Sequence, residues 1–287
     1  MKILILGGRG NLGSQLAAYL SEVHQVFSWD QEDLNVLDFD KLRINVSDLH
    51  PEIIINTVAY NAVDLCEEAS GYEAAGRLNS QYPAVLADLA LTQQAILVHY
   101  SSDYVFNGTL NKPSFLETET PNPVNRYGES KFRGELEILN RASLGLKYYL
   151  IRTSKLFGPR GSSPAAKPSF FDIMEKLAQA NKEIRAVNEE LSCFTYTPDL
   201  AAATGRLLNS GRPFGKYHLI NEGPCTWYEA AREFFRLRGL EVNLRAIRGE
   251  DLARPARRPK FSVLTNTKFK KLRDYRDALK DYVNNQI

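Results

Sequence analysis

The sequence contains no apolar run long enough to cross a membrane, and it contains few cysteines. No stretch of about 18 consecutive apolar residues occurs, so we expect no transmembrane helix and no membrane partner. The three cysteines, Cys66, Cys193 and Cys225, lie far apart and lack the spacing of metal ligands. We expect isolated buried thiols in a cytoplasmic protein and predict no metal site. An apolar strand begins at residue 2, so no signal peptide is expected.

Composition and charge are those of an ordinary globular protein. The chain has 287 residues, of which 44% are hydrophobic and 24% charged, enough for one large α/β domain or two closely joined ones. The net charge is only +2, but residues 232–276 hold 14 Lys and Arg against five Asp and Glu. This segment could be solvated surface, a nucleic-acid face or a wall facing the phosphates of a small anionic substrate. The rest of the chain favours the last interpretation, so no nucleic-acid partner is predicted.

A glycine-rich loop follows the first expected strand. Residues 2–6 are apolar, and Gly7, Gly10 and Gly13 then form a G-x-x-G-x-x-G pattern that leads into a segment with helical apolar spacing. Gly7 allows a tight turn, Gly10 lets the backbone approach a pyrophosphate, and Gly13 lets the helix pack closely on the strand. A structural turn is the alternative, but the strand–loop–helix setting favours dinucleotide binding.

The identity of the dinucleotide is left open by two residues of opposite charge. Asp30 closes the second expected strand, residues 25–29, and lies 23 positions after Gly7. A carboxylate at that offset accepts hydrogen bonds from an adenosine ribose, which favours NADH. Arg9 lies inside the loop and suits a 2′-phosphate, which favours NADPH.

Strands and helices alternate along most of the chain. We expect strands at 2–6, 25–29, 53–56, 95–100, 147–152 and 217–220, with helical segments between them. This order predicts an α/β fold, a doubly wound parallel (Rossmann) sheet with a smaller C-terminal substrate-binding lobe. The predicted dinucleotide-binding domain comprises residues 1–155 and 195–222. The predicted substrate-binding lobe comprises residues 156–194 and 223–287.

Three residues at one edge of this sheet form a candidate acid–base set. Ser102 follows the apolar run of the fourth strand, so it should lie at the carboxyl edge where open α/β sheets bind ligands. Tyr127 and Lys131 lie four apart in a predicted helix, 125–140, and share a face. We expect the ammonium of Lys131 to lower the Tyr127 pKa, which makes the phenol a general acid, while Ser102 orients the substrate oxygen. The alternative is a helix-surface tyrosine beside a solvated lysine.

Motifs along essentially the whole chain resemble those of the extended short-chain dehydrogenase/reductases, and within them the dTDP-4-dehydrorhamnose reductase family. The resemblance rests on the glycine loop, on Ala59-Tyr-Asn-Ala-Val-Asp64, on Ser101-Ser-Asp-Tyr-Val-Phe-Asn-Gly108, on Tyr127-x-x-x-Lys131, on Arg152-Thr-Ser, on Thr195-Tyr-Thr-Pro-Asp-Leu-Ala201 and on Arg257-Arg-Pro259. It implies NADH- or NADPH-dependent reduction of the C4 ketone of dTDP-4-dehydro-L-rhamnose, a nucleotide-sugar step in cell-surface polysaccharide synthesis.

The resemblance also implies the site residues. Ser102, Tyr127 and Lys131 are the expected catalytic residues. The expected cofactor-binding residues are Gly7, Gly10, Asn11, Leu12, Gly13, Asp30, Asn35, Val36, Ala59, Tyr60, Asn61, Tyr100, Tyr127 and Lys131. Ser102, Asp103, Lys155 and Arg258 are expected to contact the nucleotide-sugar substrate. A homodimer is common in the family, but no residue here demonstrates one.

Three departures from the family pattern lie on the substrate side. Lys155 stands where the family usually has tryptophan, segment 188–195 differs from the family's Asp-Gln-x-Gly-x-Pro-Thr, and loop 161–168 is rich in alanine and proline. Two alternatives therefore stay open. One is reduction of a different nucleotide-4-ketosugar. The other is a non-catalytic dinucleotide-binding subunit, like the regulatory subunit of methionine adenosyltransferase. Dehydratase chemistry is disfavoured because Tyr104, and no glutamate, follows Asp103.

Overall fold

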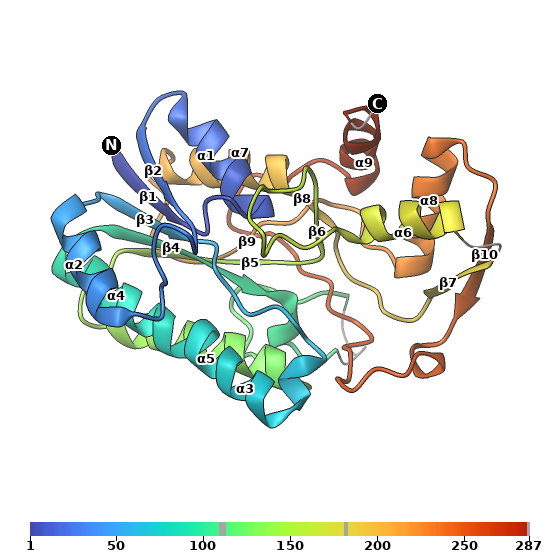
Figure 1. The fold of residues 1–287 in the computed structure, drawn as a ribbon, viewed down its shortest axis with the longest axis horizontal. Helices are drawn as coiled ribbons and strands as arrows, with labels where there is room; N and C mark the ends of the chain where they lie inside the picture. Colours follow the sequence, from blue (N-terminus) through green and yellow to red (C-terminus); the bar gives the residue numbers. More distant parts are fainter. Residues whose placement is uncertain (109–112, 181–182, 286–287) are drawn as a thin grey trace.

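The computed structural model describes residues 1–108, 113–180 and 183–285. Its centre is a six-stranded parallel sheet in the order β2-β1-β3-β4-β5-β9 (Figure 1). The strands are β1 (Lys2–Leu6), β2 (Gln25–Trp29), β3 (Ile53–Asn56), β4 (Ile96–Ser102), β5 (Tyr148–Thr153) and β9 (Gly215–His218). The predicted doubly wound parallel sheet is confirmed. The order reverses at β1 and β3, which places the carboxyl ends of these strands at a ligand-binding crevice.

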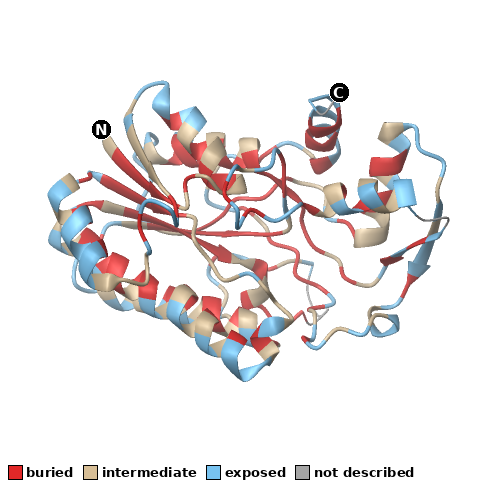
Figure 2. Ribbon diagram, viewed as in Figure 1, coloured by how far each residue is buried: buried red, intermediate tan, exposed pale blue. Residues whose placement is uncertain are grey.

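Helices cover both faces of the sheet, which explains why its central strands are apolar on both sides. α1 (Asn11–Ser21) and α7 (Thr197–Leu208) pack on one face, and α2 (Phe39–Leu49), α4 (Tyr82–Thr92) and α5 (Arg126–Ala142) pack on the other. All four residues of β3 are buried, and Figure 2 shows the central strands mostly buried, whereas no residue of the edge strand β2 is fully buried. Such continuous burial is typical of parallel strands between two helical layers.

The connection between β3 and α4 contains several short helical elements. A 3₁₀ turn (Leu65–Glu67) comes first, and α3 (Ala69–Gly76) follows it. A π-helical turn (Arg77–Gln81) then directly precedes α4. Such π turns occur frequently at functional sites.

A second lobe is assembled from segments that are far apart in the sequence. It contains β6 (Leu156–Phe157), α6 (Phe170–Ala180), β7 (Glu183–Val187), β8 (Thr195–Tyr196), α8 (Trp227–Arg238), β10 (Asn243–Ile247) and α9 (Tyr275–Asn284). β6 pairs with β8 and β7 pairs with β10, both in parallel. Buried aromatic residues fill its core, among them Phe157, Phe171, Phe194, Phe234 and Tyr282.

The C-terminal part of the chain passes between the two lobes. Phe261, Val263 and Leu264 pack with Val105 and Phe106, which follow β4. Leu272 belongs to the core beneath α1 and α7. Residues 261–272, predicted within the substrate-binding lobe, therefore also support the central sheet. The exact bounds of the two domains stay a prediction.

The cysteines and the helices can be compared with what the sequence predicted about thiols and membrane spans. Cys66, Cys193 and Cys225 are buried free thiols, as expected. No helix within the described residues is long and apolar enough to cross a membrane.

Candidate active site

The glycine-rich loop connects β1 to α1 with very little room for side chains. Gly7 has φ +79°, a conformation that favours glycine. A Cβ added to Gly13 would lie 2.1 Å from the Gly7 carbonyl oxygen, so only glycine lets α1 begin this close to the strand. The cap residue of α1, Gly10, provides no side-chain hydrogen bond, and no acidic residue lies in the first turn. The helix therefore presents backbone N–H groups and the positive end of its dipole, which fits a pyrophosphate.

Charged residues gather where β2 ends. The carboxylate of Asp30 accepts hydrogen bonds from the backbone N–H of Arg9 at 3.1 Å and of Gln31 at 2.8 Å. The guanidinium of Arg9 pairs with Glu32 and Asp33, at 2.7 Å for the closest approach to Asp33. Asp30 and Arg9, which left the identity of the dinucleotide open, thus differ in their partners. The Arg9 guanidinium is already paired with two carboxylates.

The remaining residues expected to bind the cofactor differ in burial and in their existing contacts. Leu12 is buried in the core, so only its backbone is available to a ligand. Asn35 is exposed, and its side-chain oxygen accepts from the Leu37 N–H. Val36 packs partly against the core on the α2 side. Ala59, Tyr60 and Asn61 follow the carboxyl end of β3.

The helix that carries Tyr127 and Lys131 is fixed at its start by Asn125. The Asn125 side chain accepts from the Gly128 N–H at 2.7 Å, as an N-cap does, and donates to the Arg257 carbonyl at 2.8 Å. One residue therefore begins the catalytic helix and attaches the 254–260 segment to it. An added Cβ at Gly128 would lie 2.1 Å from the Tyr104 carbonyl oxygen, so this helix also lies close to the end of β4.

Ser102 ends β4, and its hydroxyl is directed by its neighbours. It donates to Asp103 Oδ1 at 3.1 Å and accepts from the Tyr104 N–H at 3.1 Å. Asp103 is only 2% exposed, and its Oδ2 accepts from the Ser262 hydroxyl at 2.6 Å. This geometry makes Asp103 a positioning residue for Ser102. The carboxylate is buried among protein donors, and its predicted contact with the nucleotide-sugar substrate stays a prediction.

Tyr127 lies against this group of residues. Its ring packs edge-on to Tyr104, with the centroids 5.8 Å apart. Burial raises the pKa of Tyr127, and a hydrogen bond with Ser102 opposes that rise. The expected lowering of the Tyr127 pKa by Lys131 is therefore wrong for this structure, since loss of solvation outweighs the favourable contacts. The phenol keeps its proton at neutral pH, which is the form a general acid requires.

Lys131 is buried next to the same strand. Its Nζ donates to the Tyr100 carbonyl at 2.7 Å, while the Tyr100 hydroxyl bonds to Thr204 on the opposite side of the sheet. Burial lowers the pKa of Lys131 to about 8, and the charge of Glu135 works against that shift. Tyr100 thus acts on the site through its backbone, which orients the lysine.

Asn79 is a site residue that the sequence analysis missed. It lies in the π-helical turn and is 1% exposed. Its side chain accepts from the Tyr60 N–H at 2.8 Å and donates to the Tyr60 carbonyl at 2.9 Å and to Ser130 at 2.9 Å. It therefore holds the turn that borders the cofactor site against the helix that carries Lys131. The available signal was an asparagine within a helical stretch, where its helix propensity is low.

Lys155 extends into the second lobe in a strained conformation. Its φ is +36°, and its Nζ lies 3.8 Å from the centre of the Trp227 ring and 4.9 Å from that of Phe194. The ammonium donates to the Glu190 carbonyl at 3.3 Å. Burial lowers the pKa of Lys155 to about 8, and the nearby Asp103 carboxylate opposes this shift. Lys155 thus places a cation beside the Ser102–Asp103 pair.

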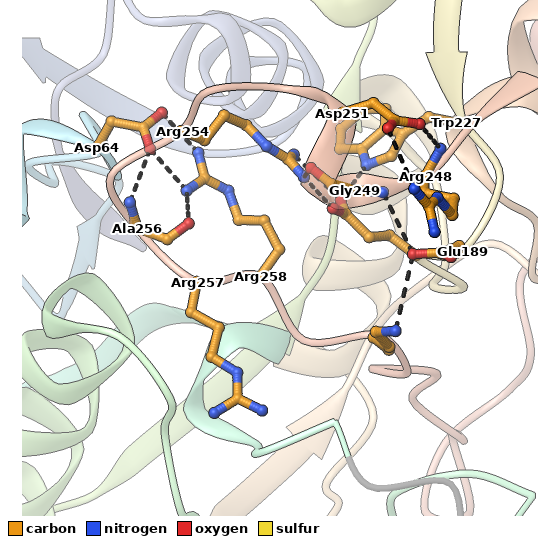
Figure 3. A network of polar contacts seen from close by, with 12 residues as sticks. Asp64, Glu189, Trp227, Arg248, Gly249, Asp251, Arg254, Ala256, Arg257 and Arg258 are labelled. Atoms are coloured by element: carbon orange, nitrogen blue, oxygen red, sulfur yellow. Dashed lines mark hydrogen bonds and ion pairs between the residues drawn. The ribbon is translucent and has the colours of Figure 1, made fainter.

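Arg258 connects the two lobes. Its guanidinium donates to both carboxylate oxygens of Asp64, at 2.8 and 2.7 Å, as Figure 3 shows. Arg254 pairs with Glu190, which also accepts from the Trp227 indole at 2.9 Å. Arg257 is exposed, and its guanidinium points away from this network. Arg258 is therefore committed to a protein carboxylate, and its contact with substrate stays a prediction.

No group of three or more potential metal ligands occurs in the described part of the chain.

The comparison with protein families decides the family. A family model described as the RmlD substrate binding domain matches residues 1–287. The chain belongs to the RmlD family. The expected resemblance and the oxidoreductase class are confirmed.

Full-length relatives support this membership. The chain is 32% identical over 289 residues to the spore coat polysaccharide biosynthesis protein SpsK of Bacillus subtilis. The alignment covers 98% of this chain and 96% of that protein. It is 31% identical to a dTDP-4-dehydrorhamnose reductase of Burkholderia thailandensis, over 94% of this chain and 92% of that protein. A dTDP-4-dehydrorhamnose reductase from Bacillus anthracis, solved with NADP, superposes with a TM-score of 0.90 at 29% identity and 99% coverage of both chains.

Membership of the RmlD family agrees with the interpretation of this edge of the sheet as the active site of an oxidoreductase. The structure brings Ser102, Tyr127, Lys131, the glycine loop and the turn at Tyr60 to one edge, as the sequence predicted. Because the Burkholderia thailandensis and Bacillus anthracis relatives are named reductases, the alternative of a non-catalytic subunit is set aside.

Proposed function

We propose that the protein reduces the C4 ketone of dTDP-4-dehydro-L-rhamnose to an alcohol, with NADH or NADPH as the reductant. The observation that carries this proposal is the placement of Ser102 and Tyr127 at the carboxyl end of β4, where a hydrogen bond links them at the same edge of the sheet as the glycine-rich loop. The reductases among the relatives support the same reaction.

In the proposed reaction, one site residue transfers a proton and the others orient the reacting groups. When bound, the reduced dinucleotide supplies a hydride to the carbonyl carbon. Tyr127 donates its proton to the ketone oxygen as negative charge develops there, and the single O–H of Ser102 turns from Asp103 to donate to the same oxygen. Asp103 holds the Ser102 hydroxyl in place before substrate binds, and Lys131, oriented by the Tyr100 carbonyl, would hold the nicotinamide ribose.

The cofactor side of this proposal rests on the glycine loop. Gly7, Gly10 and Gly13 leave the backbone at the start of α1 accessible, and Asp30 lies at the position of a ribose acceptor. The bound dinucleotide would run along the carboxyl ends of β1 and β3 toward Lys131. Asn79 supports this path because it fixes the backbone at Tyr60.

A different nucleotide-4-ketosugar is the second candidate substrate, and Lys155 favours it. A buried ammonium stacked on Trp227 suits a hydroxyl-rich or anionic sugar substituent better than a methyl group. The name of the SpsK relative refers to a polysaccharide process and to no particular sugar.

The test is ketosugar-dependent loss of absorbance at the reduced-nicotinamide band. The purified protein would be mixed with dTDP-4-dehydro-L-rhamnose, generated in situ, and either NADH or NADPH. Turnover above that of a Tyr127→Phe control supports the proposal. No turnover with this sugar, but turnover with another nucleotide-4-ketosugar that Lys155→Met abolishes, would favour the second candidate. A cytoplasmic location and a homodimer stay predictions.

A further inference from the structure

Residues 159–167, which we call the strap, lie directly on the glycine-rich loop. They connect β6 to α6 and appear in Figure 1 as the yellow-green segment near the start of α1. The Ser163 N–H donates to the Arg9 carbonyl at 2.9 Å. Asn11 binds both ends of the strap, since it accepts from the Gly161 N–H at 2.9 Å and donates to the Lys167 carbonyl at 2.8 Å. The strap is thus attached to the loop that the dinucleotide pyrophosphate would contact.

The strap has its own internal hydrogen bonds. The Arg160 guanidinium donates to the Ala166 carbonyl at 3.1 and 3.3 Å, and the Ala166 N–H donates to the Ser163 carbonyl at 2.9 Å. An added Cβ at Gly161 would lie 2.2 Å from the Arg9 carbonyl oxygen, so the two backbones are in direct contact. A short loop closed on itself in this way can move as one unit once its hydrogen bonds to Arg9, Asn11 and Asp30 break.

Ser163 occupies an acceptor that the adenosine ribose would use. Its hydroxyl donates to Asp30 Oδ1 at 2.9 Å, and the same oxygen accepts from the Gln31 N–H. Asp30 is 8% exposed and Ser163 is 7% exposed. A carboxylate oxygen has about two acceptor positions, so both on Oδ1 are taken, while Oδ2 accepts from the Arg9 N–H. A ribose hydroxyl that approaches Oδ1 therefore competes with the Ser163 hydroxyl.

We propose that the strap is a movable closure of the dinucleotide site, held down by Ser163, which imitates a ribose hydroxyl at Asp30. The dinucleotide binds after the strap lifts, and it replaces the Ser163–Asp30 bond with a ribose–Asp30 bond. This inference rests on the proposed dinucleotide binding. Because apparent affinity falls with the fraction of molecules whose site is open, weakening the closure tightens binding.

The first experiment measures binding and needs no turnover. ADP-ribose contains the adenosine ribose and the pyrophosphate, and its Kd would be measured by calorimetry for wild type, Ser163→Ala and Ser162→Ala. Ser162 is the exposed neighbour and serves as the matched control. The expected result is about tenfold tighter binding by Ser163→Ala, the fold-change that one hydrogen bond to a charged group supplies, and no change for Ser162→Ala. Unchanged or weaker binding by Ser163→Ala would overturn the proposal.

A second experiment uses the wild-type protein, so it does not depend on the variant's folding. Trypsin cleavage after Arg160, which is exposed, would be followed by mass spectrometry with and without ADP-ribose. Faster cleavage with ADP-ribose is expected, because the strap leaves the glycine loop. Slower cleavage would mean that the strap closes over the ligand and would contradict the proposal. The ketosugar assay is a separate readout, so the reductase proposal can fail while both strap results hold.

Discussion

Arg152 on β5 and Glu135 on α5 form a fully buried ion pair. Two parallel hydrogen bonds join them, at 2.9 and 2.7 Å, and both side chains are 0% exposed. The pair joins the helix that carries Tyr127 and Lys131 to the sheet. Removal of one partner leaves an unpaired buried charge, which costs about 3–5 kcal/mol.

Replacing Glu135 with glutamine should therefore destabilise the fold by several kcal/mol. Glu137→Gln, which removes a half-exposed partner of Arg141 on the same helix, should cost less than about 1 kcal/mol. Urea unfolding followed by circular dichroism measures both. The double variant Glu135→Leu/Arg152→Met should recover part of the loss, and equal losses for Glu135→Gln and Glu137→Gln would contradict the assignment.

Tyr127→Phe should lower kcat by about 10²–10⁴-fold, the range for loss of a general acid. The Kd for NADH should stay close to that of wild type, because the ring remains and only its hydroxyl is lost. Stopped-flow single turnovers and NADH fluorescence titration measure the two quantities. Tyr104→Phe alters the neighbouring ring in the same way and should reduce kcat far less. A kcat for Tyr127→Phe within threefold of wild type would remove Tyr127 from the mechanism.

The pH profile should show activity falling above about pH 8, as Lys131 loses its charge. The folded pKa of Lys131 lies below the value of about 10.4 for an unfolded lysine, so the unfolded chain binds more protons between these pH values. The contribution of Lys131 to stability therefore rises over this range, as does that of Lys155. Loss of kcat/KM above pH 8 without loss of folded protein is the expected result. The Lys155→Met variant should show the same decline of kcat/KM above pH 8. If the decline were absent in this variant, the group that titrates would be Lys155 and the assignment to Lys131 would be wrong.

The sequence predicted the sheet well because its signals are local. β1, β2 and β3 carry short apolar runs, and the glycine loop has a spacing that a single strand–turn–helix unit requires. The positions of Ser102, Tyr127 and Lys131 followed from their places at a strand end and on one helix face. These features are determined by residues close together in the sequence, so the spacing of residue types is enough to predict them.

Features that depend on distant segments could not be predicted in this way. The pKa of Tyr127 is set by burial under residues from several segments, so the spacing to Lys131 gave the wrong direction. The pairing of Arg258 with Asp64 joins residues 194 positions apart, and no local pattern marks it. The contact of Ser163 with Asp30 spans 133 positions and likewise appears only in the folded chain.

The pairing of Arg9 with Glu32 and Asp33 predicts a preference for NADH over NADPH. Asp30, Glu32 and Asp33 place three carboxylates around one arginine, so a 2′-phosphate would meet uncompensated negative charge. We expect NADH to bind about tenfold more tightly, which corresponds to ~1.4 kcal/mol, with a smaller ratio at high salt. The double variant Glu32→Gln/Asp33→Asn frees Arg9 and should reverse or abolish the preference, whereas Glu241→Gln in the second lobe should not change it. Fluorescence titrations with both dinucleotides at low and high salt measure the ratio. A wild-type protein that binds NADPH more tightly would show that Arg9 leaves its carboxylate partners when the phosphate arrives.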